Sequence, residues 1–201
     1  MPRERPSIRR SLREACVAEA LAIIGKDGLE KLSLREVARR LNVSHQAPYK
    51  HFASRDHLLA EVVRRAFDDF AKHLDARPRA LKPEADLRSM GEAYLSFAAA
   101  KPLHYRLMFE TPLPNPENHP EMLQSALHAF TLLRDAIAAR ATEASRPDTH
   151  VLDALFVWST MHGLASILRS DAAATLKLDA RAKRQMVPHV LDRVRRGLRG
   201  E

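Results

Sequence analysis

Residues 44–51 form a run of polar side chains whose chemistry suits the recognition of nucleic-acid bases. The run reads SHQAPYKH and combines hydroxyl, imidazole, amide and ammonium groups with the small Ala47. In a major groove, Gln46 could make two hydrogen bonds to an adenine, and Ala47 could touch a thymine methyl group. Val43 and Phe52 flank the run and are its expected anchors in a core. The pattern favours a short recognition helix that presents a polar face to DNA.

An amphipathic helix is predicted just before this run. Its apolar stripe recurs at helical spacing and consists of Leu34, Val37, Ala38 and Leu41. Ser33 and Glu36 form a capping box that sets the start of the helix. The helix is expected to end at Asn42, because asparagine tolerates the left-handed backbone of a tight turn. Ser44 is then placed to cap the recognition helix.

Pro48 lies about four residues past that cap. At this position proline removes roughly one hydrogen bond of the first helical turn, whereas deeper in a helix it costs about 3 kcal/mol or more. We therefore expect the recognition helix to be short and irregular and still to present its polar face.

The strings S-L-R-E-V-A, V-S and P-Y-K-H-F within residues 33–52 resemble the helix-turn-helix of TetR-type transcriptional repressors. In that family a Tyr-x-His-Phe string closes the recognition helix, and a long helix begins within a few residues. Here residues 49–52 match the string, and a long amphipathic run follows residue 56. The turn usually carries glycine where this chain has Asn42. The resemblance is strong over residues 9–60 and implies a homodimer that binds a palindromic double-stranded DNA operator. The resemblance also implies that Arg35 reaches a base. The predicted DNA-contacting set is Ser33, Arg35, Ser44, His45, Gln46, Ala47, Tyr49, Lys50, His51 and Arg55.

These residues are expected to contact DNA in two layers. His45, Gln46 and Ala47 would face base edges, because they begin the recognition helix. Tyr49, Lys50 and His51 would lie along phosphates, while Ser33 and Arg55 would hold the backbone at neighbouring helix N-termini.

A second string, W-x-x-x-H-G at residues 158–163, resembles the WHG type of C-terminal ligand-binding domain found in TetR-family regulators, as does P-L-H-Y-R-L-M-F at 102–109. Trp158 and His162 are one helical turn apart and share a face. They could be a hydrogen-bonded core pair or could line an effector pocket. Gly163 costs about 1 kcal/mol inside a helix, which predicts the close approach of another helix.

The resemblance implies release of DNA by a ligand in the C-terminal bundle. The apolar and aromatic character of the candidate residues favours a small hydrophobic or aromatic effector. For any single candidate, a place in the plain core is the favoured alternative. The pocket candidates are Phe67, Met90, Tyr94, Phe97, Tyr105, Met108, Phe109, Phe130, Trp158 and His162. In this family the last two long helices pair across a two-fold axis. The candidate dimer contacts are Leu152, Leu155, Phe156, Met186, Val187, Val190, Leu191 and Val194.

The composition predicts an all-α protein. Hydrophobic residues make up 45% of the 201 residues, glycines number only 6, and no window alternates like a strand. The division predicted is a three-helix, homeodomain-like helix-turn-helix domain at 8–53, a connecting helix and linker at 54–83, and a helical effector-binding and dimerisation bundle at 84–201. Further helices are expected at 8–26, 54–76, 85–100, 103–109, 121–144, 149–169 and 180–199, the last kinked at Pro188.

The charge distribution agrees with a polyanionic partner. The chain carries a net charge of +8, and residues 1–52 hold eleven basic residues against six acidic ones. Basic residues can also serve only to keep helices solvated. The positive charge therefore supports DNA binding mainly because it coincides with the helix-turn-helix pattern.

Other chemistries find little support in the sequence. No catalytic, metal-binding or cofactor-binding motif occurs, and the ten histidines lack helical ligand spacing. Cys16 is expected in the core, with redox sensing as the alternative. We expect no secretion signal, no membrane span and a cytoplasmic location. A non-specific architectural DNA-binding protein and an enzyme or metal-binding bundle with a borrowed helix-turn-helix remain as alternative functions.

Overall fold

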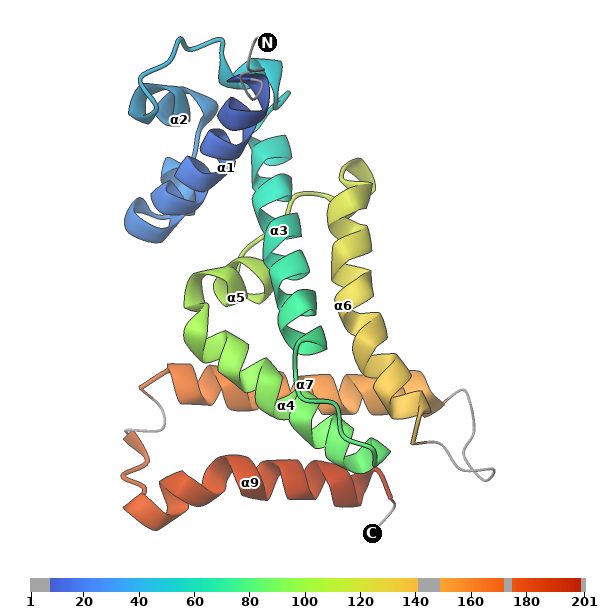
Figure 1. Ribbon diagram of the computed structural model, residues 1–201. Coiled ribbons are helices and arrows are strands. Elements are labelled where there is room, and N and C mark those ends of the chain that lie inside the picture. The colour runs from blue at the N-terminus through green and yellow to red at the C-terminus, as the bar shows by residue number, and fades with distance from the viewer. Residues whose placement is uncertain (1–7, 141–148, 172–174, 200–201) are drawn as a thin grey trace, which may run out of the picture. The chain divides into compact units, whose positions relative to one another are not determined.

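The chain is helical throughout the part that the computed structural model describes, which is residues 8–140, 149–171 and 175–199 (Figure 1). No strand occurs in those ranges, so the all-α prediction is confirmed. The α-helices are α1 (Ile8–Asp27), α2 (Leu34–Arg40), α3 (Arg55–Asp75), α4 (Pro83–Ala100), α5 (Pro102–Phe109), α6 (Pro120–Ala138), α7 (Thr149–Arg169) and α9 (Ala180–Gly197). The 3₁₀ helices are η1 (Leu29–Lys31), η2 (Pro48–Lys50) and η3 (Pro116–Asn118).

The helices group into two compact units. The first unit comprises residues 1–68 and 106–126, and the second comprises residues 69–105 and 127–201. Helices α3, α5 and α6 each contribute residues to both units. The three-part functional division at 8–53, 54–83 and 84–201 stays a prediction.

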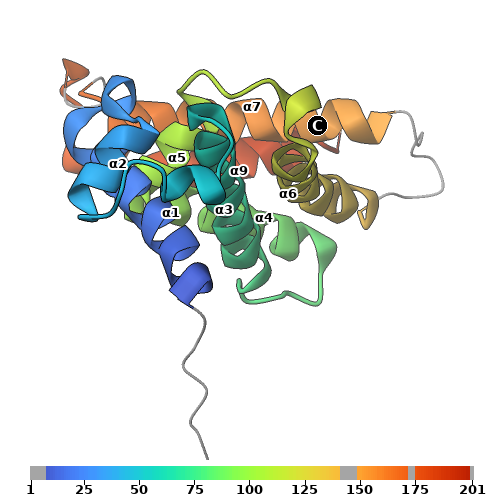
Figure 2. The same ribbon diagram turned by 90° about the horizontal axis from the view of Figure 1, so that it is seen from above.

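The first unit is built on α1, α2 and the start of α3, and α1 and α2 lie side by side (Figure 2). Leu34, Val37 and Ala38 of the predicted stripe are buried, whereas Leu41 at the C-cap is partly exposed. Cys16 is fully buried in α1, and burial raises the pKa of its thiol. Its placement in the core is confirmed, and its accessibility as a redox sensor is low.

The second unit is built on α4, α7 and α9, which contact one another. Helices α4 and α9 approach closely at Gly91 of α4, where a Cβ atom would lie 2.7 Å from the Leu191 Cδ2 atom of α9. Gly163 was expected to show such an approach, and that prediction is wrong for the single chain. It is exposed, and a Cβ atom there would meet nothing within 4 Å among the described residues.

Outside the recognition segment at residues 44–52, the predicted helix boundaries hold to within a few residues, with two differences of substance. Helix α6 ends at Ala138, whereas the prediction ran to 144, and residues 141–148 lie outside the described ranges. The proline-rich stretch 111–120 contains the short 3₁₀ helix η3. At α9, the Asp179 side chain accepts a hydrogen bond from the Ala182 amide at 2.7 Å and fixes the start of the helix.

Candidate nucleic-acid interface and ligand sites

The turn after α2 has the geometry that its sequence predicts. Asn42 adopts a φ of 53°, the left-handed conformation that few side chains tolerate. The Val43 amide then donates to the Ala38 carbonyl at 3.0 Å, and the Asn42 amide donates to the Arg39 carbonyl at 3.2 Å. The chain therefore leaves α2 sharply and enters the polar run at residue 44.

Half of the predicted capping box is present. The Ser33 hydroxyl accepts a hydrogen bond from the Glu36 amide at 3.1 Å. The Glu36 carboxylate accepts instead from Arg39 and Arg40, and these hydrogen bonds lower the pKa of Glu36 to about 2. Arg40 also reaches Asp27 of α1 at 2.5 Å, so one guanidinium group links α2 to α1.

The polar run is a turn followed by one 3₁₀ turn. The Ala47 amide donates to the Ser44 carbonyl at 2.9 Å, and the His51 amide donates to the Pro48 carbonyl at 2.9 Å. Pro48 has no amide hydrogen to continue an α-helical ladder. The prediction of a short, irregular segment is confirmed, whereas the predicted Ser44 side-chain cap is wrong, because no side chain caps η2.

The surface of this segment is polar and open. The exposed members of the predicted DNA-contacting set are Arg35, Ser44, His45, Gln46, Tyr49 and Lys50. Ala47 and His51 are half-buried, while Pro48 and Phe52 are buried and anchor the segment. Neither Arg35 nor Lys50 forms an ion pair with any residue that the structure describes. Their charges are therefore available to an external anion.

Two predicted contacts have structural roles inside the unit. The Arg55 guanidinium donates to the Leu32 and Leu29 carbonyl oxygens, both at 3.0 Å, and ties the start of α3 to η1 and its following residue. The Ser33 hydroxyl accepts from the Glu36 amide in the cap of α2, a contact that does not use its O–H donor. The Arg55 guanidinium therefore has limited freedom to reach a phosphate, whereas Ser33 is positioned by the cap and can still donate to one.

A buried carboxylate holds α1 against α3 beside this segment. Glu61 is 6% exposed and accepts hydrogen bonds from three arginines: Arg13 at 3.1 Å, Arg64 at 2.9 Å and Arg65 at 2.7 Å. Burial alone would raise its pKa, but the arginine hydrogen bonds outweigh burial and lower the pKa of Glu61 to about 2. The Arg13 guanidinium also lies 5.4 Å from the centre of the Phe52 ring. The network thus connects α3 to the residue that closes the polar run.

Two histidines line a pocket of about 250 Å³ in the first unit. His57 and His119 meet edge to face with ring centres 4.9 Å apart. Burial, and then the neighbouring His57, lower the pKa of His119. The Ser54 hydroxyl lies 2.9 Å from the His57 Nδ1 atom, at the start of α3. No local pattern in the sequence points to this pair, because the two residues are 62 positions apart.

In the second unit, two tyrosines and a histidine share one set of hydrogen bonds. The Tyr105 hydroxyl lies 2.7 Å from the His162 Nδ1 atom, and the Tyr94 hydroxyl lies 3.1 Å from that of Tyr105. Burial and the Tyr105 hydrogen bond raise the pKa of Tyr94 far above its ordinary value, although a hydrogen bond to Trp158 opposes them. The Arg169 guanidinium lies 4.5 Å from the centre of the Tyr105 ring. This cluster joins His162 and Trp158 to α4 and α5.

The ten effector-pocket candidates are divided between the two units. Phe67, Met108 and Phe109 belong to the first unit, where Phe67 and Phe109 meet edge to face at 5.9 Å. The second unit contains Met90, Tyr94, Phe97, Tyr105, Phe130, Trp158 and His162. Within the second unit the Phe130 and Trp158 rings are 6.0 Å apart, and Phe70, which the candidate set lacked, packs on Tyr94 and Phe97. Whether they contact an effector stays a prediction.

The dimer candidates also divide by exposure. Leu152, Leu155 and Phe156 of α7 are 65%, 42% and 45% exposed, which is unusual for large apolar side chains. Met186, Val187 and Val190 of α9 are half-buried. Leu191 and Val194 are 6% and 4% exposed because they pack inside the chain, so they are poorly placed to contact a second copy.

Helix α7 is the one helix among the described residues that is long and apolar enough to cross a bilayer by length and composition. We expected no membrane span because no apolar stretch in the sequence approaches the roughly 20 residues needed. That expectation does not count residues 149–169 as such a stretch. Only 28% of the most apolar window of α7 is buried within the chain. The exposed apolar face of α7 equally suits a protein partner.

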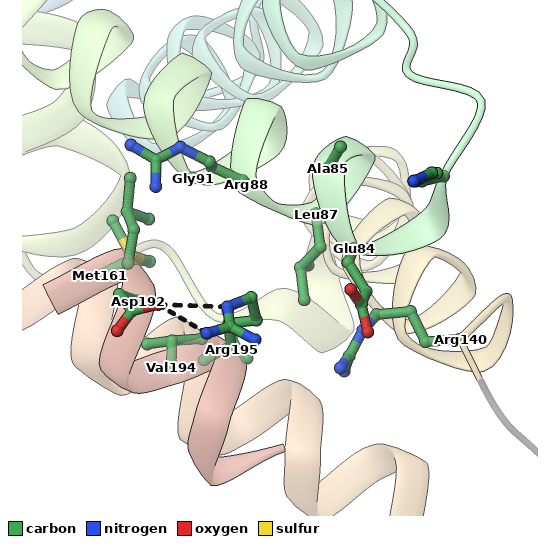
Figure 3. A pocket seen from close by; sticks show the side chains of 13 residues that line it. Glu84, Ala85, Leu87, Arg88, Gly91, Arg140, Met161, Asp192, Val194 and Arg195 are labelled. Carbon is green, nitrogen blue, oxygen red and sulfur yellow. Dashed lines mark hydrogen bonds and ion pairs between the residues drawn. The ribbon is translucent and has the colours of Figure 1, made fainter. Parts of the chain in front are cut away.

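A pocket of about 260 Å³ lies between α4, α7, α9 and the end of α6 (Figure 3). Its lining residues are Lys82, Glu84, Ala85, Leu87, Arg88, Gly91, Arg140, Val157, Met161, Leu191, Asp192, Val194 and Arg195. None of the ten effector-pocket candidates lines it. Those candidates are mostly aromatic, whereas this lining mixes aliphatic and charged residues, and so the sequence pattern did not predict the pocket.

The structure offers no cluster of metal ligands in the ranges that it describes. Within residues 8–140, 149–171 and 175–199, no three His, Cys, Asp or Glu side chains gather closely enough to hold a metal ion.

Solved structures of other bacterial proteins share this fold. A protein of unknown function from Rhodococcus sp. RHA1 is 28% identical, covers 98% of each chain and superposes with a TM-score of 0.75. A tetR-family bacterial regulatory protein from Rhodococcus RHA1 is 18% identical, covers 92% of this chain and 95% of its own, and has a TM-score of 0.69. At that identity the second comparison supports the fold alone.

Sequence comparison identifies the family. The HTH-type transcriptional regulator Rv1816 of Mycobacterium tuberculosis is 30% identical over 116 residues, which are 56% of this chain. The chain spans about half the length of the curated relatives it matches. Residues 17–62 match the sequence model of bacterial regulatory proteins of the tetR family, and residues 87–192 match that of the tetracyclin repressor-like C-terminal domain. The WHG subtype stays a prediction, because the C-terminal match carries a different description. The chain belongs to the TetR family of bacterial regulatory proteins.

Proposed function

We propose that this protein is a dimeric transcriptional regulator that binds a palindromic DNA operator and responds to a small ligand. The observation that carries the proposal is the open polar segment at residues 44–50, which follows α2 within the part of the chain that matches the tetR-family model. Such a protein would work in the cytoplasm, where bacterial DNA lies. We favour repression, because a dimer bound at an operator blocks polymerase directly.

Base recognition and phosphate binding are assigned to different side chains of the segment. His45, Gln46 and Ala47 would read bases, since amide and small apolar groups can distinguish base edges. Tyr49 and Lys50 would hold phosphates, since a phosphate contact carries no sequence information. Arg35 on α2 would reach a base. His51 is half-buried and would contribute at the margin.

Selection of bound DNA from a random pool tests this assignment. Gln46→Ala should relax the preference at one base position, at a cost of about 1–3 kcal/mol. Lys50→Ala should weaken binding to all sequences and lower the salt slope by about 0.9 for each recognition segment. Lys72→Ala removes the same charge from an exposed site of the second unit and serves as the control. The assignment is reversed if Lys50→Ala alters the selected motif while Gln46→Ala leaves it unchanged.

Dimerisation is proposed through the exposed faces of α7 and α9. One recognition segment reads only a few base pairs, so two segments about 34–36 Å apart are needed to span one turn of DNA. Leu152, Leu155 and Phe156 supply the exposed apolar surface. Met186, Val187 and Val190 would complete it from α9.

Light scattering on the purified protein tests the dimer. We expect a dimer at micromolar concentration and a monomer for Leu155→Arg. Leu81→Arg is the matched control, because Leu81 is a fully exposed leucine outside α7 and α9. A monomeric unmodified protein would contradict this part of the proposal.

Ligand control is proposed to act through α3, which is one continuous helix from the DNA-binding end of the chain into the second unit. A ligand changes DNA binding only if its affinity differs between the two arrangements of the protein. The aromatic cluster of Tyr94, Tyr105, Trp158 and His162 favours a small hydrophobic or aromatic effector. Repeating the DNA selection with a metabolite and drug panel tests this step, and a panel without any effect on the selected site would argue against it.

A further inference from the structure

The pocket between α4, α7, α9 and the end of α6 has an apolar floor. Leu87 extends from α4 into the space above α9 (Figure 3). Val157 and Met161 of α7 and Leu191 of α9 complete the floor, and all four side chains are buried. These residues offer aliphatic and thioether surface to a hydrocarbon group.

The rim of the pocket is charged and mainly basic. Four basic residues and two acidic residues line it, namely Lys82, Arg88, Arg140 and Arg195 with Glu84 and Asp192. Both acids have arginine partners. Asp192 accepts from Arg195 at 2.8 Å and pairs with Arg196, while Glu84 pairs with Arg199. The acids are therefore largely neutralised, and the rim favours an anion.

Arg140 has unused donor capacity at a buried atom. Its Nε atom is buried and has no hydrogen-bond partner among the residues that the structure describes. Its guanidinium lies beside Glu84 in Figure 3, yet the hydrogen bonds of Glu84 go to Arg199. A buried donor without an acceptor is costly, and a carboxylate accepts from a guanidinium in a fixed, paired geometry. Arg88 differs, because it is exposed and its Nε atom donates to Glu92 at 3.0 Å.

The volume limits the size of the ligand. A protein cavity of about 150 Å³ accommodates benzene, so about 260 Å³ accommodates roughly ten non-hydrogen atoms. This size suits a short alkyl chain or one aromatic ring with a small polar head.

We propose that this pocket is a binding site for a small amphipathic organic anion. The carboxylate binds the Arg140 guanidinium, and the hydrocarbon part lies on Leu87, Val157 and Met161. The site is separate from the Tyr94–Tyr105–His162 cluster of the proposed effector response. Its occupation requires neither DNA nor a response of DNA binding, so the inference stands or falls independently of the proposed function.

Titration of the full-length protein with three eight-carbon probes tests the site. Octanoate, octanol and octylamine share the hydrocarbon chain and differ in the charge of the head group. We expect saturable binding of octanoate by calorimetry, at least tenfold weaker binding of octanol and none of octylamine. In methionine-methyl NMR spectra the Met161 signal should shift during the titration, because it is the methionine that lines the pocket.

Variants then assign the carboxylate to Arg140. Arg140→Gln should weaken octanoate binding at least tenfold, and Arg140→Lys should retain part of it. Arg88→Gln is the matched control from the same rim and should stay within twofold. Leu87→Phe fills the apolar floor and should also weaken binding, which gives a second test if Arg140→Gln is poorly folded by circular dichroism.

Three results would each overturn the proposal. The first is a lack of saturable octanoate binding up to millimolar concentration. The second is equal affinity for octanoate and octanol together with unchanged affinity in Arg140→Gln. The third is binding that leaves the Met161 methyl signal in place, since this would locate octanoate elsewhere on the protein.

Discussion

Replacement of Glu61 by glutamine should destabilise the protein in a manner that depends on pH. The Glu61 carboxylate is 6% exposed and accepts from Arg13, Arg64 and Arg65. Burial opposes its ionisation, yet these hydrogen bonds lower its pKa from an ordinary value of 4.5 to about 2. A difference of one pKa unit corresponds to about 1.4 kcal/mol, so the ionised carboxylate contributes about 3 kcal/mol at neutral pH.

The three arginines determine how much the Glu61→Gln replacement lowers the free energy of unfolding. Removal of one partner from a fully buried ion pair typically costs about 3–5 kcal/mol. Here Arg65 keeps its pair with Glu14 at 2.5 Å, and Arg64 keeps its pair with Asp68 at 2.6 Å. Both guanidinium groups also retain some access to water. We therefore expect Glu61→Gln to cost about 3 kcal/mol at pH 7, the lower end of the range.

The sign of the pH dependence follows from the lowered pKa. A carboxylate with a lowered folded-state pKa stabilises the protein above its ordinary pKa, and the contribution is lost as pH falls toward the folded-state value. For Glu61 the window runs from about 4.5 down to about 2. At pH 3, about 2 kcal/mol of the contribution should be gone, so the difference between the unmodified protein and the Glu61→Gln variant should shrink to about 1 kcal/mol.

Urea unfolding at pH 7 and pH 3, at one fixed protein concentration, measures both differences. Glu14→Gln is the control, because Glu14 contacts the same Arg65 but is exposed, and an exposed pair contributes at most about 1 kcal/mol. Other carboxylates with lowered pKa values, such as Glu36, affect both proteins equally and cancel in the difference. A cost below about 1 kcal/mol at pH 7, or an equal cost at both pH values, would refute the reasoning.

Three further predictions concern single positions. Gly163→Ala should raise the unfolding midpoint in urea by the equivalent of about 1 kcal/mol, because a Cβ atom there meets no described residue. A lower midpoint would indicate that a second copy covers this site. Asn42→Val should cost about 1–2 kcal/mol and Asn42→Gly much less, as measured by thermal unfolding, because a β-branched residue is strained at a φ of 53°. Burial lowers the pKa of His119, so the contribution of this residue to the free energy of unfolding should be full above pH 6.5 and should fall as pH decreases below it. His119→Gln should therefore flatten the fall in melting temperature between pH 7 and pH 5.

Local patterns predicted the helices and the turn of this protein well. The start of α2 at Leu34, the left-handed Asn42 and the bounds of α7 all follow from interactions among residues a few positions apart. Such short-range rules depend on backbone sterics and side-chain capping, which a single sequence displays directly. The effect of Pro48 was predictable for the same reason.

Sites assembled from distant residues were not predictable in this way. Arg140 and Leu87 are 53 positions apart and share a pocket, and His57 meets His119 across 62 positions. No periodicity connects such residues, because their proximity depends on how whole helices pack. The expectation for Gly163 failed for this reason too: the cost of a helical glycine is local, but the neighbour that could compensate it belongs to the tertiary structure.

Because the recognition segment at residues 44–50 is irregular, we expect the Glu61 network to affect DNA binding. An α-helix in a groove is held rigid by its own hydrogen bonds, but residues 44–50 form a turn and one 3₁₀ turn. Their position therefore depends on buried anchors, chiefly Phe52, whose ring lies beneath the Arg13 guanidinium. Arg13 is in turn held by Glu61. We expect Glu61→Gln to weaken operator binding even where the protein remains fully folded, and Glu14→Gln to leave it unchanged. Equal operator affinities of the two variants at 10 °C, with both folded by circular dichroism, would show that the segment keeps its geometry without this support.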